Sequence, residues 1–227
     1  MNKYGLLALI LTVLIISTSI AIAAPTGGLL TILSTERGSD SEAQSFTTQG
    51  GNVTEATIVG RVITDRWAGF YGSATGQIFA GDGSGNTYFQ WTTVDMTDGV
   101  IYASDGQVND WLNLRPAVVG DMPGFVQGVA TDNFAATFSS TEVFDSASLT
   151  IPATPYALSW QNISGTAGVG NLRTYALHDD SDGNNIFAGK IIDDAASFAG
   201  GETVDYQIIV PAQTAVDTTY WFYLEMP

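Results

Sequence analysis

The chain contains no cysteine and only one histidine, His178. The missing thiols exclude disulfides, cysteine nucleophiles, cysteine-ligated zinc and iron–sulfur clusters. A single imidazole excludes metal centres built from several histidines. A Ser-His-Asp triad would have to use His178, yet the sequence has no nucleophile-elbow motif for it to serve. We therefore interpret His178 as a structural or solvent-facing residue and predict that the protein is not an enzyme.

Basic residues are also scarce. Lys and Arg number 7 against 23 Asp and Glu, and the formal net charge at pH 7 is −16. An acidic surface of this kind repels the phosphate backbone of nucleic acids and the headgroups of anionic lipids. We expect neither nucleic acid nor, once the signal described below is removed, a membrane as a partner. Divalent cations remain compatible with this charge.

The first 23 residues have the pattern of an export signal. Lys3 gives a short basic start, Leu6–Ile16 is an apolar run, and Ala21-Ile22-Ala23 is an A-x-A cleavage pattern. We predict a signal helix over residues 1–23 that is cleaved after Ala23, and hence a secreted or cell-surface location. One alternative is a helix retained as an anchor, because the apolar run approaches membrane-spanning length. Another is a pilin-type signal cut near Lys3-Tyr4-Gly5.

Residues 24–51 form a separate N-terminal region. Leu29–Ser34 is a short apolar stretch, followed by the polar segment Glu36–Gly51. One interpretation makes Leu29–Ser34 the first core strand. The other makes it a donor strand that completes the sheet of a neighbouring subunit by pairing with an open edge. The donor side chains would then be Leu29, Leu30, Ile32 and Leu33.

Helical periodicity is nearly absent after the signal. Short β-branched and aromatic stretches alternate with Gly, Asp and Asn turns, which is typical of a two-sheet β fold. We predict one all-β domain over residues 52–227, an antiparallel β-sandwich of jelly-roll or immunoglobulin-like type; a split near Ala117–Gly128 is the alternative. A short helix is the ambiguous interpretation of Asn109–Arg115. The expected strands are Glu55–Thr64, Val94–Tyr102, Asn133–Ser139, Leu149–Ile151, Tyr156–Gln161, Arg173–His178, Ile186–Ile192, Thr203–Pro211 and Thr218–Met226.

The segment Arg66–Trp91 is aromatic at both ends and rich in glycine. We predict a β-hairpin with arms Phe70–Ala80 and Asn86–Trp91, because the glycines of the loop Gly81–Gly85 tolerate the positive φ angles of tight turns. The carboxylate of Asp82 in this loop could bind a metal ion, but the turn itself already explains an aspartate there.

A second acidic turn carries the stronger calcium signal. Asp180, Asp182 and Asn184 place oxygen ligands at alternate positions, as calcium loops do. An EF-hand is excluded, since Asn185 stands where glycine is needed and Ile191 where the bidentate glutamate is needed. The choice is therefore between a looser calcium site and an ordinary turn; we expect no other cofactor.

Two further patterns bear on glycans. Asn52-Val53-Thr54 and Asn162-Ile163-Ser164 are N-glycosylation sequons, so Asn52 and Asn162 are candidate acceptors. Several aromatic residues would bind sugar rings if they formed a flat exposed strip, but buried aromatics also supply the core of a disulfide-free β domain. These residues are Trp67, Phe70, Tyr71, Tyr88, Phe89, Trp91, Trp111, Trp160 and Trp221.

The aromatic segment carries a resemblance. Trp67-Ala68-Gly69-Phe70-Tyr71-Gly72 followed by Gly85-Asn86-Thr87-Tyr88-Phe89-Gln90-Trp91 resembles a group of secreted archaeal surface proteins with W-x-G-[FY]-[FY]-G and G-N-x-[FY]-[FY]-x-W segments. The closing Tyr220–Glu225 looks like that group as well. The resemblance implies an extracellular, β-rich protein and supplies no catalytic residues. The apolar N-terminal strand and aromatic last strand are more distantly similar to donor-strand filament subunits of archaeal bundling pili and bacterial biofilm fibres.

Together these features predict an exported, non-enzymatic structural or adhesion protein of the cell surface. A filament subunit with Leu29–Ser34 as donor strand is the specific form we expect, with other copies or other surface proteins as partners. The alternative is an extracellular module that binds a carbohydrate or another polymer. A lesser alternative is a glycan hydrolase with two facing carboxylates, whose spacing only a structure gives.

Overall fold

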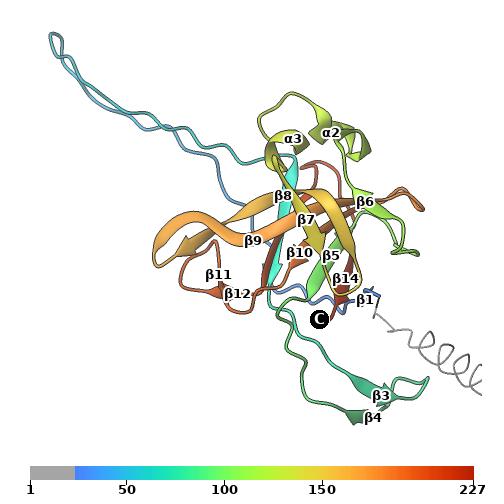
Figure 1. Cartoon of the computed structure of the whole chain (residues 1–227). Coiled ribbons are helices and arrows are strands. Elements are labelled where there is room, and N and C mark those ends of the chain that lie inside the picture. Colours follow the sequence, from blue (N-terminus) through green and yellow to red (C-terminus); the bar gives the residue numbers. More distant parts are fainter. Residues whose placement is uncertain (1–23) are drawn as a thin grey trace, which may run out of the picture.

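The computed structural model describes residues 24–227 and shows an antiparallel, mostly β protein (Figure 1). The all-β prediction is confirmed. The predicted signal helix, its A-x-A site and the two alternatives to it fall on residues 1–23, which lie outside the described residues. Within residues 24–227, no helix is long and apolar enough to cross a membrane.

One large sheet organises the chain. Its strand order is β1-β14-β5-β10-β9-β8-β7, with β6 also paired to β9. Every residue of β5, and all but the last of β10, is buried, which explains their nearly uninterrupted apolar sequences VIYAS and NIFAGK. The bounds are β1 Thr26–Gly27, β5 Val100–Ser104, β6 Leu114–Pro116, β7 Ser140–Asp145, β8 Thr150–Ile163, β9 Thr166–Asp179, β10 Asn185–Lys190 and β14 Trp221–Glu225.

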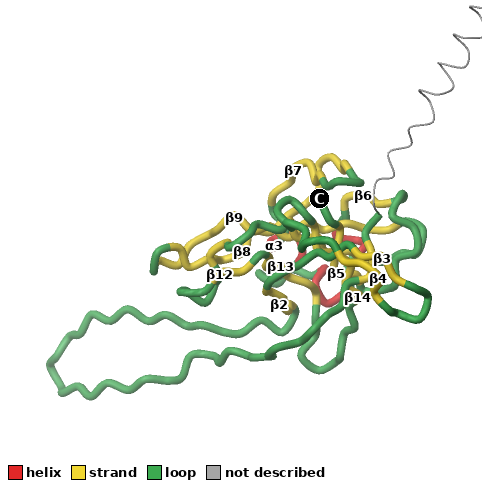
Figure 2. The backbone as a smooth tube through the Cα atoms, turned by 90° about the horizontal axis from the view of Figure 1, so that it is seen from below, coloured by secondary structure: helices red, strands yellow, loops and turns green. Residues whose placement is uncertain are grey.

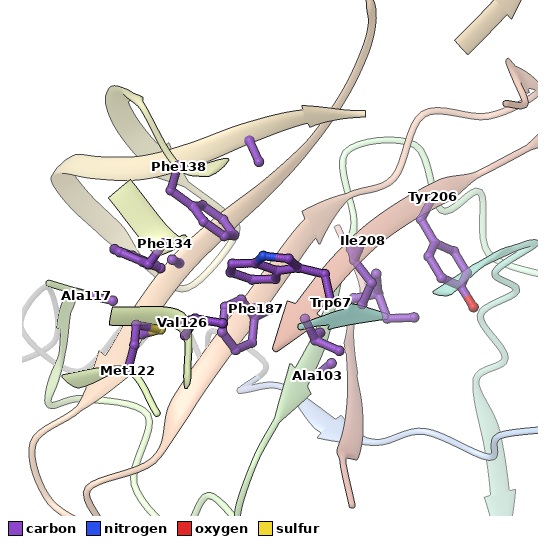
Figure 3. Packing of buried hydrophobic residues seen from close by; sticks show 14 residues of the cluster. Trp67, Ala103, Ala117, Met122, Val126, Phe134, Phe138, Phe187, Tyr206 and Ile208 are labelled. Carbon is purple, nitrogen blue, oxygen red and sulfur yellow. The ribbon is translucent and has the colours of Figure 1, made fainter. Parts of the chain in front are cut away.

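A two-stranded sheet packs on one face of the large sheet. It consists of β2 (Trp67–Gly72) and β13 (Tyr206–Pro211). Ile208 of β13 is buried against Ala103 of β5 and Phe187 of β10 in one apolar cluster (Figure 3). Trp67 lies at the centre of this cluster, and its indole N–H donates to the Asp132 carbonyl at 2.5 Å.

Short helical turns close the end of that cluster. They are η1 (Val119–Asp121), α2 (Gly124–Gln127) and α3 (Phe134–Thr137). Phe134 and Phe138 stack with ring centroids 5.0 Å apart, and Phe138 also contacts Trp67. We predicted a strand over Asn133–Ser139, and this was wrong. The Asn133 side chain accepts a hydrogen bond from Ala136 N–H at 2.8 Å, and this N-cap starts a helix instead.

The other face of the large sheet has its own aromatic cluster, around Tyr102, Phe144 and Tyr175. The buried carboxylate of Glu225 lies at its edge. It accepts hydrogen bonds from the Tyr102 hydroxyl and from Ser148 N–H, the latter at 2.7 Å. The last strand, β14, is thereby tied to the turn between β7 and β8.

The predicted long hairpin is shorter than expected. Only β3 (Phe79–Gly81) and β4 (Thr87–Gln90) pair with each other. The first half of the predicted arm Phe70–Ala80 belongs to β2, because the apolar strand β13 offers it a partner over the packed core. A further two-stranded pair, β11 (Ala195–Ala196) with β12 (Thr203–Val204), lies beside the long β8–β9 hairpin (Figure 1).

Two segments expected to form strands do not do so: Leu29–Ser34 is not the first core strand, which was one of its two interpretations, and the prediction of a strand over Glu55–Thr64 is wrong. The ambiguous segment Asn109–Arg115 forms no helix. The chain around Asn113 instead leads into β6. The first two segments have the composition of strands but lack a ladder partner within residues 24–227. A strand is stabilised only by such pairing, so both run as extended, exposed chain.

Candidate functional site

Residues 38–63 form a long projection that we call the arm. Its two limbs run away from the body as a long open loop, overlapping in Figure 1 and separated in Figure 2, and reverse at Gln49–Asn52. Gly51 has φ 90°, a left-handed conformation that suits glycine at such a turn. At the base, Asp40 accepts a hydrogen bond from Ile63 N–H at 2.7 Å, and Ser41 N–H donates to the Arg61 carbonyl at 2.9 Å.

Beyond that base the arm is loosely held. Within the described chain, no backbone hydrogen bond joins the limbs between Ser41–Arg61 and the turn. Large apolar side chains are nevertheless exposed along it, namely Phe46, Val53, Ile58, Val59 and Val62. Glu55 is the only charged residue from Ala43 to Gly60. An uncharged, apolar and exposed segment on an acidic protein is typical of an interaction site.

The predicted donor strand lies between β1 and the arm. Leu29 is 100% exposed and Leu33 is 93% exposed, while Leu30 and Ile32 are about half to two-thirds exposed. Only the residues just before them pair with the sheet, where Thr26 lies opposite Leu224. The four side chains therefore contribute little to the core of their own chain, and their role as a donor strand stays a prediction.

A second projection, the aromatic hairpin, comprises residues 77–92 around β3 and β4. Five large side chains on it are about half exposed or more, namely Ile78, Phe79, Tyr88, Phe89 and Trp91. Phe89 and Trp91 contact each other edge to face, with centroids 4.9 Å apart and planes at 76°. Asp82 is the only charged residue between Gly72 and Val94. The hairpin stands clear of the body (Figure 1).

Asp82 acts as the cap of the hairpin loop. Its carboxylate accepts hydrogen bonds from the Asn86 side chain at 2.8 Å, Asn86 N–H at 2.9 Å and Ser84 N–H at 3.0 Å. These donors, the Asn86 side chain first among them, lower the pKa of Asp82 below its ordinary value. The loop thus holds its shape through its own hydrogen bonds, which explains the acidic residue without a metal.

The residues of the predicted calcium loop point to different partners. Asp180 binds Arg115 at 2.8 Å, Asp182 accepts hydrogen bonds from Asn109, and the Asn184 amide donates to the Gln107 carbonyl at 3.0 Å. Across residues 24–227, no three Asp, Glu, His or Cys side chains are grouped closely enough to hold a metal ion. These contacts fasten the turn to β6 and to the loop before it, and the calcium site stays a prediction.

One buried carboxylate remains in that turn. Asp179 is fully buried, its Oδ1 accepts a hydrogen bond from Ser181 N–H at 2.8 Å, and its Oδ2 has no partner among the described residues. Calcium takes about six to eight oxygen ligands, so this single oxygen does not amount to a site. His178 next to it contacts Asn185 at 3.2 Å and is mostly buried, which agrees with its structural interpretation.

The two sequons differ in accessibility. Asn52 is exposed at the turn of the arm. The Asn162 side chain packs against Gly200, and its Oδ1 is buried. Of the two predicted glycosylation sites, the geometry favours Asn52, because an oligosaccharide needs an amide that is free in solvent.

The predicted aromatic strip is divided among several places. Trp67 lies in the core, Trp111 packs between Tyr102 and Tyr223, and Trp160 and Trp221 are about half exposed on separate strands. Exposed rings meet at two places in residues 24–227, namely the aromatic hairpin and the pair Tyr71 and Phe198, whose planes are also nearly perpendicular at 83°. The perpendicular planes of Phe89 and Trp91 do not form the flat platform on which sugars stack.

A shallow cavity of about 360 Å³ lies at the root of the aromatic hairpin, lined by Asp95, Asp193 and Asp205 among others. The charge of Asp194, then desolvation and the charges of Asp205 and Asp95, raise the pKa of Asp193. Asp205 and Asp95 are engaged as caps, accepting from Ala74 N–H at 2.7 Å and Thr97 N–H at 2.9 Å. This is where the hydrolase alternative would have to be tested.

Sequence reasoning missed the exposed apolar side chains of the arm. The segment Glu36–Gly51 was interpreted as polar, either a linker or a surface loop, so Phe46 was not singled out. The signal that was available is the absence of charge from Ala43 to Thr54 in a chain with 23 acidic residues.

Comparisons with known proteins assign no function, so a function has to be inferred from the geometry described above. The chain matches no protein-family model, no curated protein and no solved structure.

Proposed function

We propose that this protein is an exported, non-enzymatic structural protein of the cell surface that assembles with copies of itself. The observation that carries the proposal is the contrast between a closely packed body and an N-terminal region, residues 29–63, whose apolar side chains are exposed. Burying one Leu or Ile side chain contributes about 1.5–3 kcal/mol. The donor side chains gain little of this burial free energy within their own chain, and burial against a neighbouring copy would supply it. They are Leu29, Leu30, Ile32 and Leu33.

The body offers an edge of the right kind. The sheet β2–β13 has two strands, whereas the sheet beneath it has eight. At the rim next to β2, Phe70 contacts Phe222 with centroids 5.0 Å apart, and Phe222 and Leu224 are only half-buried. We interpret the molecule as a two-layer β-sandwich whose smaller layer is incomplete. A neighbour's Leu29–Ser34 pairing with the outer edge of β2 would extend that layer and cover this rim.

A contact of this type has a consequence for the assembly. The donor strand and the acceptor edge are different surfaces of the same chain. Each copy can therefore donate its strand to one neighbour and accept a strand from another. Contacts of this head-to-tail kind produce rings if the rotation closes and filaments if it does not. We therefore propose a filament as the assembled form, located outside the cell in keeping with the predicted export signal.

The test compares the mature chain, beginning at residue 24, with a variant carrying Leu29→Ser, Ile32→Ser and Leu33→Ser. We expect the parent chain to form filaments in negative-stain electron microscopy and the variant to remain small. A matched control replaces apolar residues exposed on the body, Leu112→Ser and Val129→Ser, and should assemble like the parent. A parent chain that stays monomeric at high concentration, with and without calcium, contradicts the proposal.

The exposed rings of the aromatic hairpin favour a second candidate, a module that binds a carbohydrate or another surface polymer. Retention of the mature chain on insoluble polysaccharide, lost in Tyr88→Ala, would support it. The hydrolase alternative predicts release of reducing sugar that is lost in Asp193→Asn. The perpendicular Phe89 and Trp91 rings and the capping roles of Asp95 and Asp205 make both weaker than assembly.

A further inference from the structure

We propose that the arm of one copy binds the aromatic hairpin of the next copy. This inference rests on the proposed self-assembly and names a second contact within it. The two surfaces are the limb of the arm that carries Ile58 and Val62, and the strand pair that carries Tyr88, Phe89 and Trp91. Both are exposed in the single chain, and both are elements of β-type sequence that lack a third strand within residues 24–227.

The aromatic hairpin needs a partner for physical reasons. An isolated pair of strands is marginally stable in water, and three strands with an apolar face are needed for independent stability. β3 and β4 form such a pair, held by a ladder that shifts register after Ala80 and by the Asp82 loop. Their outer edges face no other strand of the described chain, so backbone N–H and C=O groups are available for strand addition.

The arm supplies the complementary element. Residues 55–63 are rich in β-branched side chains, and in extended chain alternate residues share a face, which puts Ile58 and Val62 together. Ile58 is 92% exposed and Val62 is 84% exposed. A limb added to β3 or β4 would make a sheet of three strands and bring these aliphatic side chains against the aromatic rings.

The same chain cannot make this contact with itself in the observed arrangement. The arm and the aromatic hairpin project from opposite sides of the body in Figure 1, and in Figure 2 the turn of the arm again lies far from β3 and β4. A donor at one end and an acceptor at the other is the arrangement that links successive copies. It also runs in the same head-to-tail sense as the proposed donor strand.

Charge favours a second copy as the occupant. The net charge of −16 makes bodies repel one another at close range, whereas the arm from Ala43 to Gly60 and the segment from Gly72 to Val94 carry one acidic residue each. Ile58 lies between the base and the turn of the arm, and Val62 lies at the base beside Arg61. Surfaces with so few charged residues repel each other less than the acidic bodies do.

The absence of cysteine makes a direct test clean. Mature chains carrying Ile58→Cys are mixed with mature chains carrying Tyr88→Cys and treated with a short bismaleimide crosslinker. We expect a crosslinked dimer containing one chain of each kind, identified by mass spectrometry. The matched control replaces Tyr88→Cys by Leu112→Cys, a similarly exposed apolar position on the body, and should give no dimer.

A second measurement asks whether the contact matters for assembly. Ile58→Ser with Val62→Ser in the arm, or Phe89→Ser with Trp91→Ser in the hairpin, should each raise the concentration needed for assembly on the order of a hundredfold or more, since each removes two apolar contacts. Unchanged thermal unfolding of the single chains would show that the body is intact. Leu112→Ser with Val129→Ser serves again as the control.

The outcomes separate this inference from the proposed function. Filaments that form without the Ile58–Tyr88 crosslink, and without loss in the arm or hairpin variants, overturn the arm–hairpin contact and leave self-assembly standing. Crosslinks only between two arms, or only between two hairpins, overturn it as well. Chains that neither assemble nor crosslink contradict both. If the mature chain is retained on polysaccharide through the aromatic hairpin and no crosslink forms, the aromatic rings bind a glycan and the inference is overturned.

Discussion

The body and the two projections are built from the same kinds of residue but differ in what covers them. Phe187 in β10 is fully buried among Ala103, Phe138 and Ile208, whereas Phe46 on the arm is 76% exposed. Strand-type composition is therefore distributed over the whole described chain, while close packing within the chain is found beyond about Asp65 and, before that, only in the short stretch Pro25–Gly28 that joins β14. The largest expected difference between the two kinds of region is in stability.

Removing a ring should cost stability in the body and leave it unchanged on the arm. We expect Phe187→Ala to lower the free energy of unfolding by about 3–5 kcal/mol, because it leaves a cavity in the cluster around Trp67. Phe46→Ala should change it by less than about 0.5 kcal/mol, as exposed substitutions do. Urea unfolding of dilute protein measures both, and a comparable loss from Phe46→Ala would mean that the arm is part of the folded core.

An ion pair should make the body's stability depend on acid pH. Arg115 donates to both oxygens of Asp121, at 2.7 and 2.8 Å, and these hydrogen bonds lower the pKa of Asp121 to about 2. A depressed folded-state pKa stabilises the fold above pH 4, and this stability is lost as the pH falls from about 4 to 2. We expect Asp121→Asn to lower the free energy of unfolding by about 1–2 kcal/mol at pH 7. This is less than the pKa shift alone would give, because solvent around the partly exposed Arg115 screens the ion pair.

The difference in the free energy of unfolding between Asp121→Asn and the parent chain should shrink to a small fraction near pH 2, where the parent carboxylate is about half protonated. Unfolding by urea at pH 7, 4 and 2 follows this convergence. Asp217→Asn, a change at an exposed position whose carboxylate makes no hydrogen bond within residues 24–227, is the control for a general loss of negative charge. A difference that stays constant with pH would contradict the assigned role of the ion pair.

A smaller effect is expected at the cap of α3. Asn133→Ala removes the acceptor for Ala136 N–H and should lower the free energy of unfolding by about 1 kcal/mol. Asn133→Asp keeps an acceptor and should cost less. Because α3 carries Phe134 into the cluster, the loss should appear in global unfolding; no loss in Asn133→Ala would mean that this turn does not depend on its cap.

The smallest expected change in stability accompanies a large change in assembly. Val62→Ser on the arm should leave the unfolding of the single chain within about 0.5 kcal/mol of the parent. Sedimentation velocity at raised concentration should show less association than in the parent. If Val62→Ser instead destabilised the single chain while association persisted, the distinction between body and projection would fail.

The sequence predicted the body well and its surroundings poorly, for one physical reason. Alternation and turn residues anticipated strands that are now β8, β9, β10, β13 and β14, because these segments find partners within the chain. Leu29–Ser34 and Glu55–Thr64 show the same local pattern without such partners. Local composition reports the capacity to pair, and only the fold shows whether a partner is present.

The acidic turn illustrates a second limit. Asp180, Asp182 and Asn184 have the spacing of a calcium loop, but their partners Arg115, Asn109 and Gln107 come from a loop far away in the chain. Spacing along the sequence could not reveal these long-range contacts. The loop Gly81–Gly85 and the second arm of the predicted hairpin agree with β3 and β4, whereas the start of the first arm belongs to β2. Spacing does not show the pairing of β2 with β13 that separates the hairpin from the body.

The central claim is that the exposed N-terminal region joins one chain to another. The most direct measurement is negative-stain electron microscopy of the mature chain beside the Leu29→Ser, Ile32→Ser, Leu33→Ser variant, at equal concentration. The account predicts regular filaments from the parent and discrete single particles from the variant. Discrete single particles from both, with residues 29–63 intact in the parent, would contradict it.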